Sequence, residues 1–207
     1  MRCFIYTGGR EFFPDRIAFR PREGDLVIAA DSGYRLAVEL GIRVDMVLGD
    51  FDSSDMPDAS GADVVVYPPQ KDDTDTMIAI KYALERGCDE ICIIGGMGGR
   101  LDHYMANVFA LEYISGHGAR GTITNGQNTA RYLTQGERAE VAAGGSKYLS
   151  ILPLREQIRV SCGGVKYPLT RHIVSMGEAS FTVSNEIVQD AWVEVHEGAA
   201  IIVQCGD

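Results

Sequence analysis

The chain has 207 residues, of which 45% are hydrophobic and 23% are charged, and its net charge is −10. This length allows one large domain or two small ones, and either can bury a core. The acidic balance argues against a general nucleic-acid or membrane-surface binder, because both classes need clustered positive charge.

The cysteines and the first residues indicate a reducing compartment. Five cysteines without a CxxC pair fit neither a disulfide framework nor a zinc cluster. Residues 1–9 are too short and too soon interrupted by glycine for a signal peptide. No apolar run approaches the roughly 18 residues of a membrane span. We therefore expect a cytoplasmic protein.

Up to about residue 125, short apolar strands alternate with helical stretches. Asp31-Ser32-Gly33 opens the first helix, and Thr74 is a suitable N-cap for a second helix over 75–85. A third helix is expected over 101–114. Strands that alternate with helices predict a mostly parallel sheet covered on both faces. The strand-like runs are residues 26–30, 46–48, 64–67 and 91–94. The expected apolar face of the third helix is Leu101, Met105, Val108 and Leu111.

Beyond about residue 128 the helical period disappears. Short β-like runs separated by glycine turns predict a small antiparallel sandwich or barrel. We therefore predict an α/β domain over 1–126, a mostly parallel sheet flanked by helices, followed by a small antiparallel β-sandwich over 127–207. The β-like runs are residues 148–152, 158–161, 180–183, 191–196 and 199–204.

Carboxylates follow the strand-like runs of the first domain. Asp50 and Asp52 follow one strand, and Asp72, Asp73 and Asp75 follow the next. Ligands of open α/β sheets bind beyond the carboxyl ends of the strands, and Mg²⁺ prefers hard oxygen ligands. These acids therefore predict a site for Mg²⁺ and phosphates. Two blander interpretations stay open, namely that acids cap a turn or complement a helix N-terminus.

The run Gly95-Gly96-Met97-Gly98-Gly99 lies between a strand and a helix. Bare N–H groups at such a place can bind phosphate, although glycine loops are often only tight turns. The run is neither a Walker motif nor a clean GxGxxG fingerprint. Arg100 strengthens the phosphate interpretation because it can pair bidentately. Asp102 could hold a metal, a ligand amine or Arg100 itself, and His103 is more typical of a packing or hydrogen-bonding residue than of a base.

The second domain offers fewer candidates. Ser184 and Asn185 supply a compact hydroxyl and amide suited to a small polar ligand, against the alternative of an ordinary β-turn. Trp192 could stack on a flat ring, but a lone tryptophan in a strand pattern is usually part of a core. No nucleophilic triad is evident, because no serine lies in a GxSxG elbow.

Taken together, these strings resemble the thiamine pyrophosphokinase family, and the match extends over nearly the whole chain. The resemblance implies an α/β nucleotide-binding domain followed by a small β-sandwich, in homodimers whose active sites lie between subunits. It also implies Mg²⁺-dependent transfer of a diphosphoryl group from ATP to the hydroxyl of thiamine, with release of AMP. The matching strings are Asp31-Ser32-Gly33, Gly49-Asp50-Phe51-Asp52-Ser53, Lys71-Asp72-Asp73-Thr74-Asp75, Gly98-Gly99-Arg100-Leu101-Asp102-His103, Tyr167-Pro168-Leu169 and Ser184-Asn185-Glu186.

The resemblance also implies roles for the candidate residues. Asp72 would share the metal shell or position the attacking hydroxyl, and Lys71 and Arg100 would neutralise phosphate charge. Asp102 would contact the thiamine aminopyrimidine or the reacting hydroxyl, and Ser184 and Asn185 would complete the thiamine pocket. The implied Mg²⁺ ligands are Asp50, Asp52 and Asp75. The implied nucleotide-cleft residues are Asp31, Gly95, Gly96, Gly98, Gly99 and Arg100.

Two other functions remain possible on the sequence alone. A Mg²⁺-dependent nucleotide or phosphoester hydrolase would keep the metal site and release phosphate or AMP without thiamine. A nucleotide sensor would bind ATP tightly without turnover, but a site with both acids and cations exceeds what a sensor needs.

Overall fold

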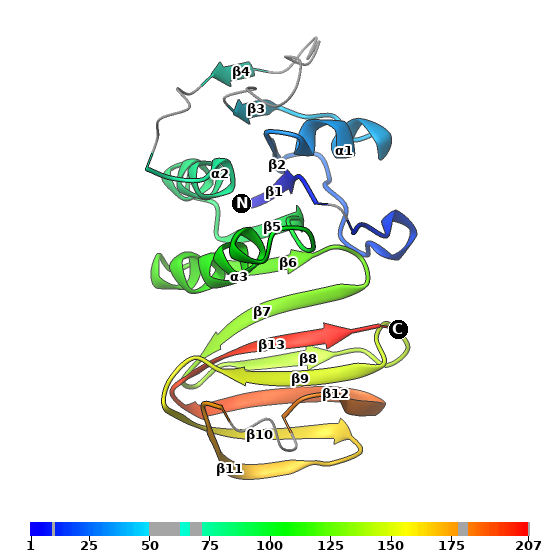
Figure 1. Cartoon of the computed structure of the whole chain (residues 1–207), viewed down its shortest axis with the longest axis vertical. Coiled ribbons are helices and arrows are strands. Elements are labelled where there is room, and N and C mark those ends of the chain that lie inside the picture. Colours follow the sequence, from blue (N-terminus) through cyan, green and yellow to red (C-terminus); the bar gives the residue numbers. More distant parts are fainter. Residues whose placement is uncertain (10, 50–62, 67–71, 178–181, 207) are drawn as a thin grey trace. The chain divides into compact units, whose positions relative to one another are not determined.

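A computed structural model describes most of the chain, in two compact units, Met1–Gly126 and Gln127–Asp207 (Figure 1). Three residues that the sequence nominates, Asp50, Asp52 and Lys71, lie outside the described residues. The described ranges are 1–9, 11–49, 63–66, 72–177 and 182–206.

The first unit is built on a parallel sheet with the strand order β6-β5-β1-β2-β3-β4. Each neighbouring pair in this order is parallel, as the alternation of strands and helices predicted. The central strand β1 is buried on both faces, with Phe4 2% exposed and Ile5 fully buried. The strands are β1 (Arg2–Thr7), β2 (Leu26–Ala30), β3 (Met46–Gly49), β4 (Asp63–Val66), β5 (Glu90–Gly95) and β6 (Arg120–Thr124).

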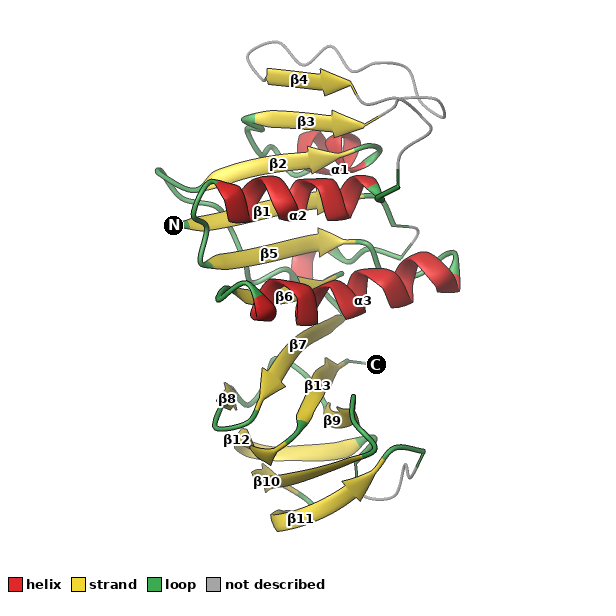
Figure 2. Ribbon diagram, turned by 90° about the vertical axis from the view of Figure 1, so that its left-hand side faces the viewer, coloured by secondary structure: helices red, strands yellow, loops and turns green. Residues whose placement is uncertain are grey.

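Helices cover both faces of this sheet. Figure 2 shows α2 (Asp75–Glu85) and α3 (Leu101–Gly116) on one face and α1 (Gly33–Glu39) on the other. A 3-10 turn, η1 (Pro14–Arg16), lies between β1 and β2. Helix α2 has the predicted bounds, because the Thr74 hydroxyl accepts the Met77 N–H at 3.2 Å and caps its first turn.

The predicted apolar face of α3 is wrong in its first half. Leu101 is 70% exposed and Met105 is 39% exposed. Helix α3 instead packs through its second half, where Leu111 and Ile114 fill the space above Gly121 of β6. That contact sets the rotation of the helix. The buried residues of α3 are Asn107, Ala110, Leu111 and Ile114.

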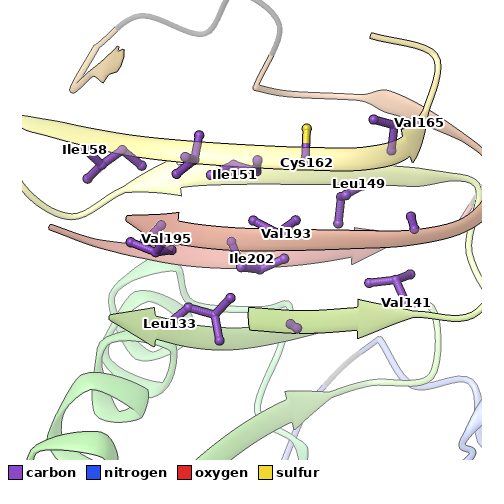
Figure 3. Packing of buried hydrophobic residues seen from close by; sticks show 14 of the residues in the cluster. Leu133, Val141, Leu149, Ile151, Ile158, Cys162, Val165, Val193, Val195 and Ile202 are labelled. Carbon is purple, nitrogen blue, oxygen red and sulfur yellow. The ribbon is translucent and has the colours of Figure 1, made fainter. Parts of the chain in front are cut away.

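The second unit is an antiparallel β-sandwich, as predicted. One sheet has the order β7-β13-β9-β12 and the other has the order β8-β12-β10-β11, with the long strand β12 shared between them. Figure 3 shows the side chains of the core that these strands enclose, among them Leu149, Val193 and Ile202. The strands are β7 (Asn128–Thr134), β8 (Arg138–Val141), β9 (Tyr148–Pro153), β10 (Gln157–Val165), β11 (Leu169–Ser175), β12 (Asn185–Glu197) and β13 (Ala199–Cys205).

Two details of the sandwich differ from expectation. The described part of the predicted strand 180–183, Thr182 and Val183, lies in a turn before β12. Trp192 is not part of the sandwich core, because it alternates with the inward-facing Ala191 and Val193. Its ring lies under the Arg138 guanidinium, 4.2 Å from the ring centroid.

The cysteines are free thiols, and only Cys205 is partly exposed. Among the described residues, no helix is long and apolar enough to cross a membrane.

Candidate active site

A cleft of about 740 Å³ lies at the carboxyl ends of the parallel strands of the first unit. Strand β1 lies between β2 and β5, and the chain runs outward from β1 to β4 before it returns to β5. Such a reversal of strand order separates the neighbouring loops, and ligands of α/β sheets bind there. The described lining residues are Thr7, Gly8, Gly9, Ala30, Asp31, Ser32, Thr74, Asp75, Thr76, Gly96, Gly98, Gly99, Arg100, His103 and Asn107.

The glycine loop after β5 has a backbone that other residues rarely adopt. Gly95, Gly96, Gly98 and Gly99 all have φ between 68° and 93°, in the left-handed region that favours glycine. Gly96, Gly98 and Gly99 line the cleft, whereas Gly95 is not among the described lining residues. A side chain at Gly95 would lie 2.2 Å from the Thr7 carbonyl oxygen, so this glycine is required for packing.

Gly96 has both of its backbone polar groups occupied. Its N–H donates to the Gly8 carbonyl at 3.1 Å, and its carbonyl accepts the Asn107 amide N–H at 3.0 Å. The sequence-based view of a loop with bare N–H groups therefore does not hold at Gly96. The cleft-lining glycines beyond it, Gly98 and Gly99, directly precede Arg100 and the N-terminus of α3.

The start of α2 brings one described acid, Asp75, to the cleft. Asp75 lines it, next to the N-cap Thr74 and the buried Thr76. Asp72 is exposed and is not among the described lining residues. Asp73 forms an ion pair with Lys81 at 2.5 Å, so its charge is compensated within the unit.

Asp31 is the less satisfied of the two acids among the described lining residues. Its backbone has φ 49°, which is unusual for a residue other than glycine. Its Oδ1 is buried and has no hydrogen-bond partner among the described residues. A buried polar atom without a partner is costly, and in native proteins it often marks a functional site. Asp31 therefore offers a fixed oxygen acceptor at the cleft.

Arg100 and Asp102 form a bidentate pair at the start of α3. Arg100 Nε and Nη2 donate to the two Asp102 oxygens at 3.2 and 2.6 Å, and Asp102 also accepts the His103 N–H at 2.9 Å. The guanidinium holds the pKa of Asp102 below its usual range, and the carboxylate raises the pKa of Arg100. Both side chains are more than 60% exposed, so an incoming phosphate can compete for Arg100. Arg100 lines the cleft, while Asp102 is not among the described lining residues.

Ser184 and Asn185 belong to the second unit. Asn185 is 4% exposed and holds the backbone of Tyr167 from both sides: its Oδ1 accepts the Tyr167 N–H at 3.0 Å, and its Nδ2 donates to the Tyr167 carbonyl at 2.8 Å. Ser184 has φ 57°, and its N–H donates to the Ser150 hydroxyl at 3.1 Å. The amide of Asn185 therefore fixes the turn between β10 and β11.

Sequence reasoning missed part of the cleft. Thr7 ends β1 and is followed by Gly8 and Gly9, and Thr76 follows the recognised acid Asp75. A polar and glycine string at a strand end was the available signal for the first group.

Within the described ranges, no three His, Cys, Asp or Glu side chains gather into a metal site. The predicted metal ligands Asp50 and Asp52 lie outside those ranges.

Both units match models of one protein family. The model described as the thiamin pyrophosphokinase catalytic domain matches residues 22–121. The model described as the thiamin pyrophosphokinase vitamin B1 binding domain matches residues 138–201. The thiamine pyrophosphokinase of Bacillus subtilis (strain 168) is 29% identical over 191 residues, which cover 89% of this chain and 88% of that protein.

Solved structures agree with this match. A thiamine pyrophosphokinase structure from Bacillus subtilis has a TM-score of 0.88 and 26% identity, and the two chains cover each other completely. One from Geobacillus thermodenitrificans has a TM-score of 0.83 and 29% identity, covering all of this chain and 98% of the other. The match of both domain models, in order, confirms the resemblance seen in the motifs: the chain belongs to the thiamine pyrophosphokinase family.

Proposed function

We propose that this chain transfers a diphosphoryl group from ATP to thiamine, in a Mg²⁺-dependent reaction that gives thiamine diphosphate and AMP. One observation carries the proposal: a cleft at the strand-order reversal combines acids, a glycine loop and an arginine, within a chain that matches the catalytic and the vitamin B1 binding models in order. Phosphoryl transfer needs this combination, because it depends on positioning and charge neutralisation rather than on covalent protein chemistry.

The transfer makes one bond and breaks one bond. The hydroxyl oxygen of thiamine attacks the β-phosphorus of ATP, and the bond from that phosphorus to the oxygen bridging the α-phosphorus breaks. AMP leaves with the bridging oxygen, and the hydroxyl proton passes to water or to a carboxylate. Charge therefore changes most around the β-phosphate, where the cations of the cleft are needed.

The acids of the cleft fit a magnesium ion. Asp75 lines the cleft and Asp31 carries an oxygen that has no partner within the part of the chain that the structure describes, and carboxylate oxygens are the donors that Mg²⁺ prefers. Asp75 would hold the ion with Asp50 and Asp52, and Asp72 would share its water shell or position the hydroxyl. When bound, Mg²⁺ supplies positive charge to the β- and γ-phosphates.

The remaining cleft residues would hold the nucleotide. Arg100 and Lys71 would neutralise phosphate oxygens, and Gly98 and Gly99 would direct backbone N–H groups toward them. Asp31 would accept a hydrogen bond from the nucleotide. Release of Arg100 to phosphate would free the carboxylate of Asp102 for thiamine.

We further propose that thiamine is bound with the help of Ser184 and Asn185, in a homodimer whose active sites lie between subunits. Because the Asn185 amide is already bonded to Tyr167, its part would be to hold the Tyr167 turn in place for the ligand. A cytoplasmic location would supply the ATP that the reaction uses.

The test is an incubation of the purified protein with ATP, Mg²⁺ and thiamine, followed by separation of the products. Equal amounts of AMP and thiamine diphosphate, both absent when thiamine or Mg²⁺ is omitted, are expected. ADP with thiamine monophosphate would move the attack to the γ-phosphorus. Phosphate or AMP formed without thiamine would support a hydrolase, and ATP binding without any product would support a sensor.

A further inference from the structure

A chain of buried contacts connects the glycine loop to the start of α2. Thr7, the last residue of β1, is 7% exposed, and Thr76, in the first turn of α2, is 6% exposed. Their hydroxyl oxygens lie 2.9 Å apart and share a hydrogen bond. This bond connects residues 69 positions apart in the sequence, so it ties the helix directly to the central strand.

The same threonine also contacts the glycine loop. A Cβ at Gly96 would lie 2.8 Å from the Thr7 methyl carbon and 2.7 Å from the Asn107 amide nitrogen. Gly96 is therefore enclosed by Thr7 on one side and by Asn107 of α3 on the other. Its carbonyl accepts the Asn107 N–H at 3.0 Å, and the Asn107 side chain is 9% exposed.

These contacts set the distance between the acid at the start of α2 and the glycine loop after β5. Thr76 follows Asp75, the acid at the cleft, and Gly96 begins the loop that leads to Gly98, Gly99 and Arg100. Buried polar pairs that are fully bonded fix one arrangement of the elements that carry them. A shift of about 1 Å between reacting groups can lower a rate about a hundredfold, so this separation matters for transfer.

We propose that Thr7, Thr76 and Asn107 are positioning residues for the diphosphoryl transfer. They hold the phosphate-binding loop at a fixed distance from the acidic start of α2, and none of the three needs to touch a reacting atom. The inference rests on the proposed function, because it assigns the loop to phosphate and Asp75 to the metal.

The first experiment removes the hydroxyl pair without changing its shape. Thr7→Val and Thr76→Val each leave one buried hydroxyl unpaired, whereas the double variant replaces both partners by apolar groups, which is often nearly neutral for stability. We expect the double variant to melt near the wild-type temperature and to lose at least about tenfold in kcat. The KM values for ATP and thiamine should change by less than about threefold, as for an interaction needed in the transition state.

Two controls separate positioning from general damage. Thr7→Ser and Thr76→Ser keep the hydroxyl group and should recover most of the lost kcat. Thr124→Val removes another buried hydroxyl at a strand end, one that accepts the Gly126 N–H at 3.0 Å and is not among the described cleft residues. It should lower stability while leaving kcat within about twofold, as expected for an ordinary buried hydrogen bond.

Asn107→Asp provides a second route if the valine variants do not fold. This variant keeps the shape of the side chain but cannot donate to Gly96, so kcat should again fall at least about tenfold. A wild-type kcat in the folded double valine variant, or in Asn107→Asp, would overturn the proposal. Absence of thiamine diphosphate with the wild-type protein would instead reject the proposed function itself.

Discussion

The two candidate regions of this chain differ in how their polar groups are satisfied. In the cleft of the first unit, Asp31 has strained backbone and a buried oxygen without a partner among the described residues. In the second unit, Asn185 is also buried, but its amide oxygen and its amide nitrogen both form hydrogen bonds with the backbone of Tyr167. Unsatisfied groups are available to a ligand, whereas satisfied ones shape the backbone. Substitutions in the cleft should therefore change mainly kcat, and substitutions around Asn185 should change mainly the free energy of unfolding.

The largest expected effect comes from the acids assigned to the metal. Asp75→Asn and Asp52→Asn should each lower kcat by at least about a hundredfold, since loss of a charge-neutralising group commonly costs a few kcal/mol of transition-state stabilisation. The measurement is AMP formation at saturating substrates over a range of Mg²⁺ concentrations. A folded variant with normal turnover would remove that residue from the metal site.

Asp31→Asn should lower activity without lowering stability. Asparagine has the same shape and tolerates a positive φ, but it removes the charge of a carboxylate whose Oδ1 is buried without a partner among the described residues. We expect kcat to fall about tenfold, while the free energy of unfolding stays constant or rises. Parallel assays of turnover and urea unfolding test this. A clear loss of stability would show that the oxygen has a partner in the folded protein.

Asn185→Asp, in contrast to Asp31→Asn, should lower the stability of the fold. The aspartate cannot donate to the Tyr167 carbonyl, so the free energy of unfolding should drop by about 1–3 kcal/mol. The KM for thiamine should rise several-fold, and the KM for ATP should not change. Tyr167→Phe is the matched control, because it leaves both backbone hydrogen bonds intact and should lose less stability than Asn185→Asp. Equal changes in the two KM values would contradict a role limited to the thiamine turn.

The smallest effect is expected from the pair of Arg100 and Asp102. Since the pKa of Asp102 is lowered in the folded protein, the pair stabilises the fold above the ordinary carboxyl range and ceases to do so as the pH falls through the lowered pKa. Both side chains are exposed, so the contribution is small. The wild type should melt slightly above Asp102→Asn near neutral pH, and the two melting temperatures should converge as the pH falls through the lowered pKa of Asp102. Thiamine KM should still rise in the variant.

Local signals in the sequence predicted much of the fold. The cap at Thr74 and the stop at Gly87 define α2, and the change of period separates the parallel sheet from the sandwich. The face of α3 was not predictable in this way, because its rotation depends on the gap at Gly121 in a strand further along the chain. Helical spacing alone cannot show which turns of a helix reach a neighbour.

In the candidate site, too, residues with a local sequence signal were predicted and contacts between distant elements were not. Asp31 was nominated by the resemblance, and Asp75, Arg100 and three loop glycines were nominated from strand ends and helix starts; all of these residues line the cleft. The bond between Thr7 and Thr76 was not foreseen, because nothing local connects two threonines in different elements. Nor did the turn-like string at Asn185 reveal that its amide would be occupied by Tyr167.

The long strand β12 has a consequence for how the second unit unfolds. Its first residues, Asn185 and Glu186, pair with β9, whereas Ala191–Glu194 pair with β8 on one edge and residues 192–195 pair with β10 on the other. Neither sheet can release this strand without disrupting the other. The two sheets should therefore open as one cooperative unit, with backbone amides in β9 and β10 exchanging with solvent through the same opening.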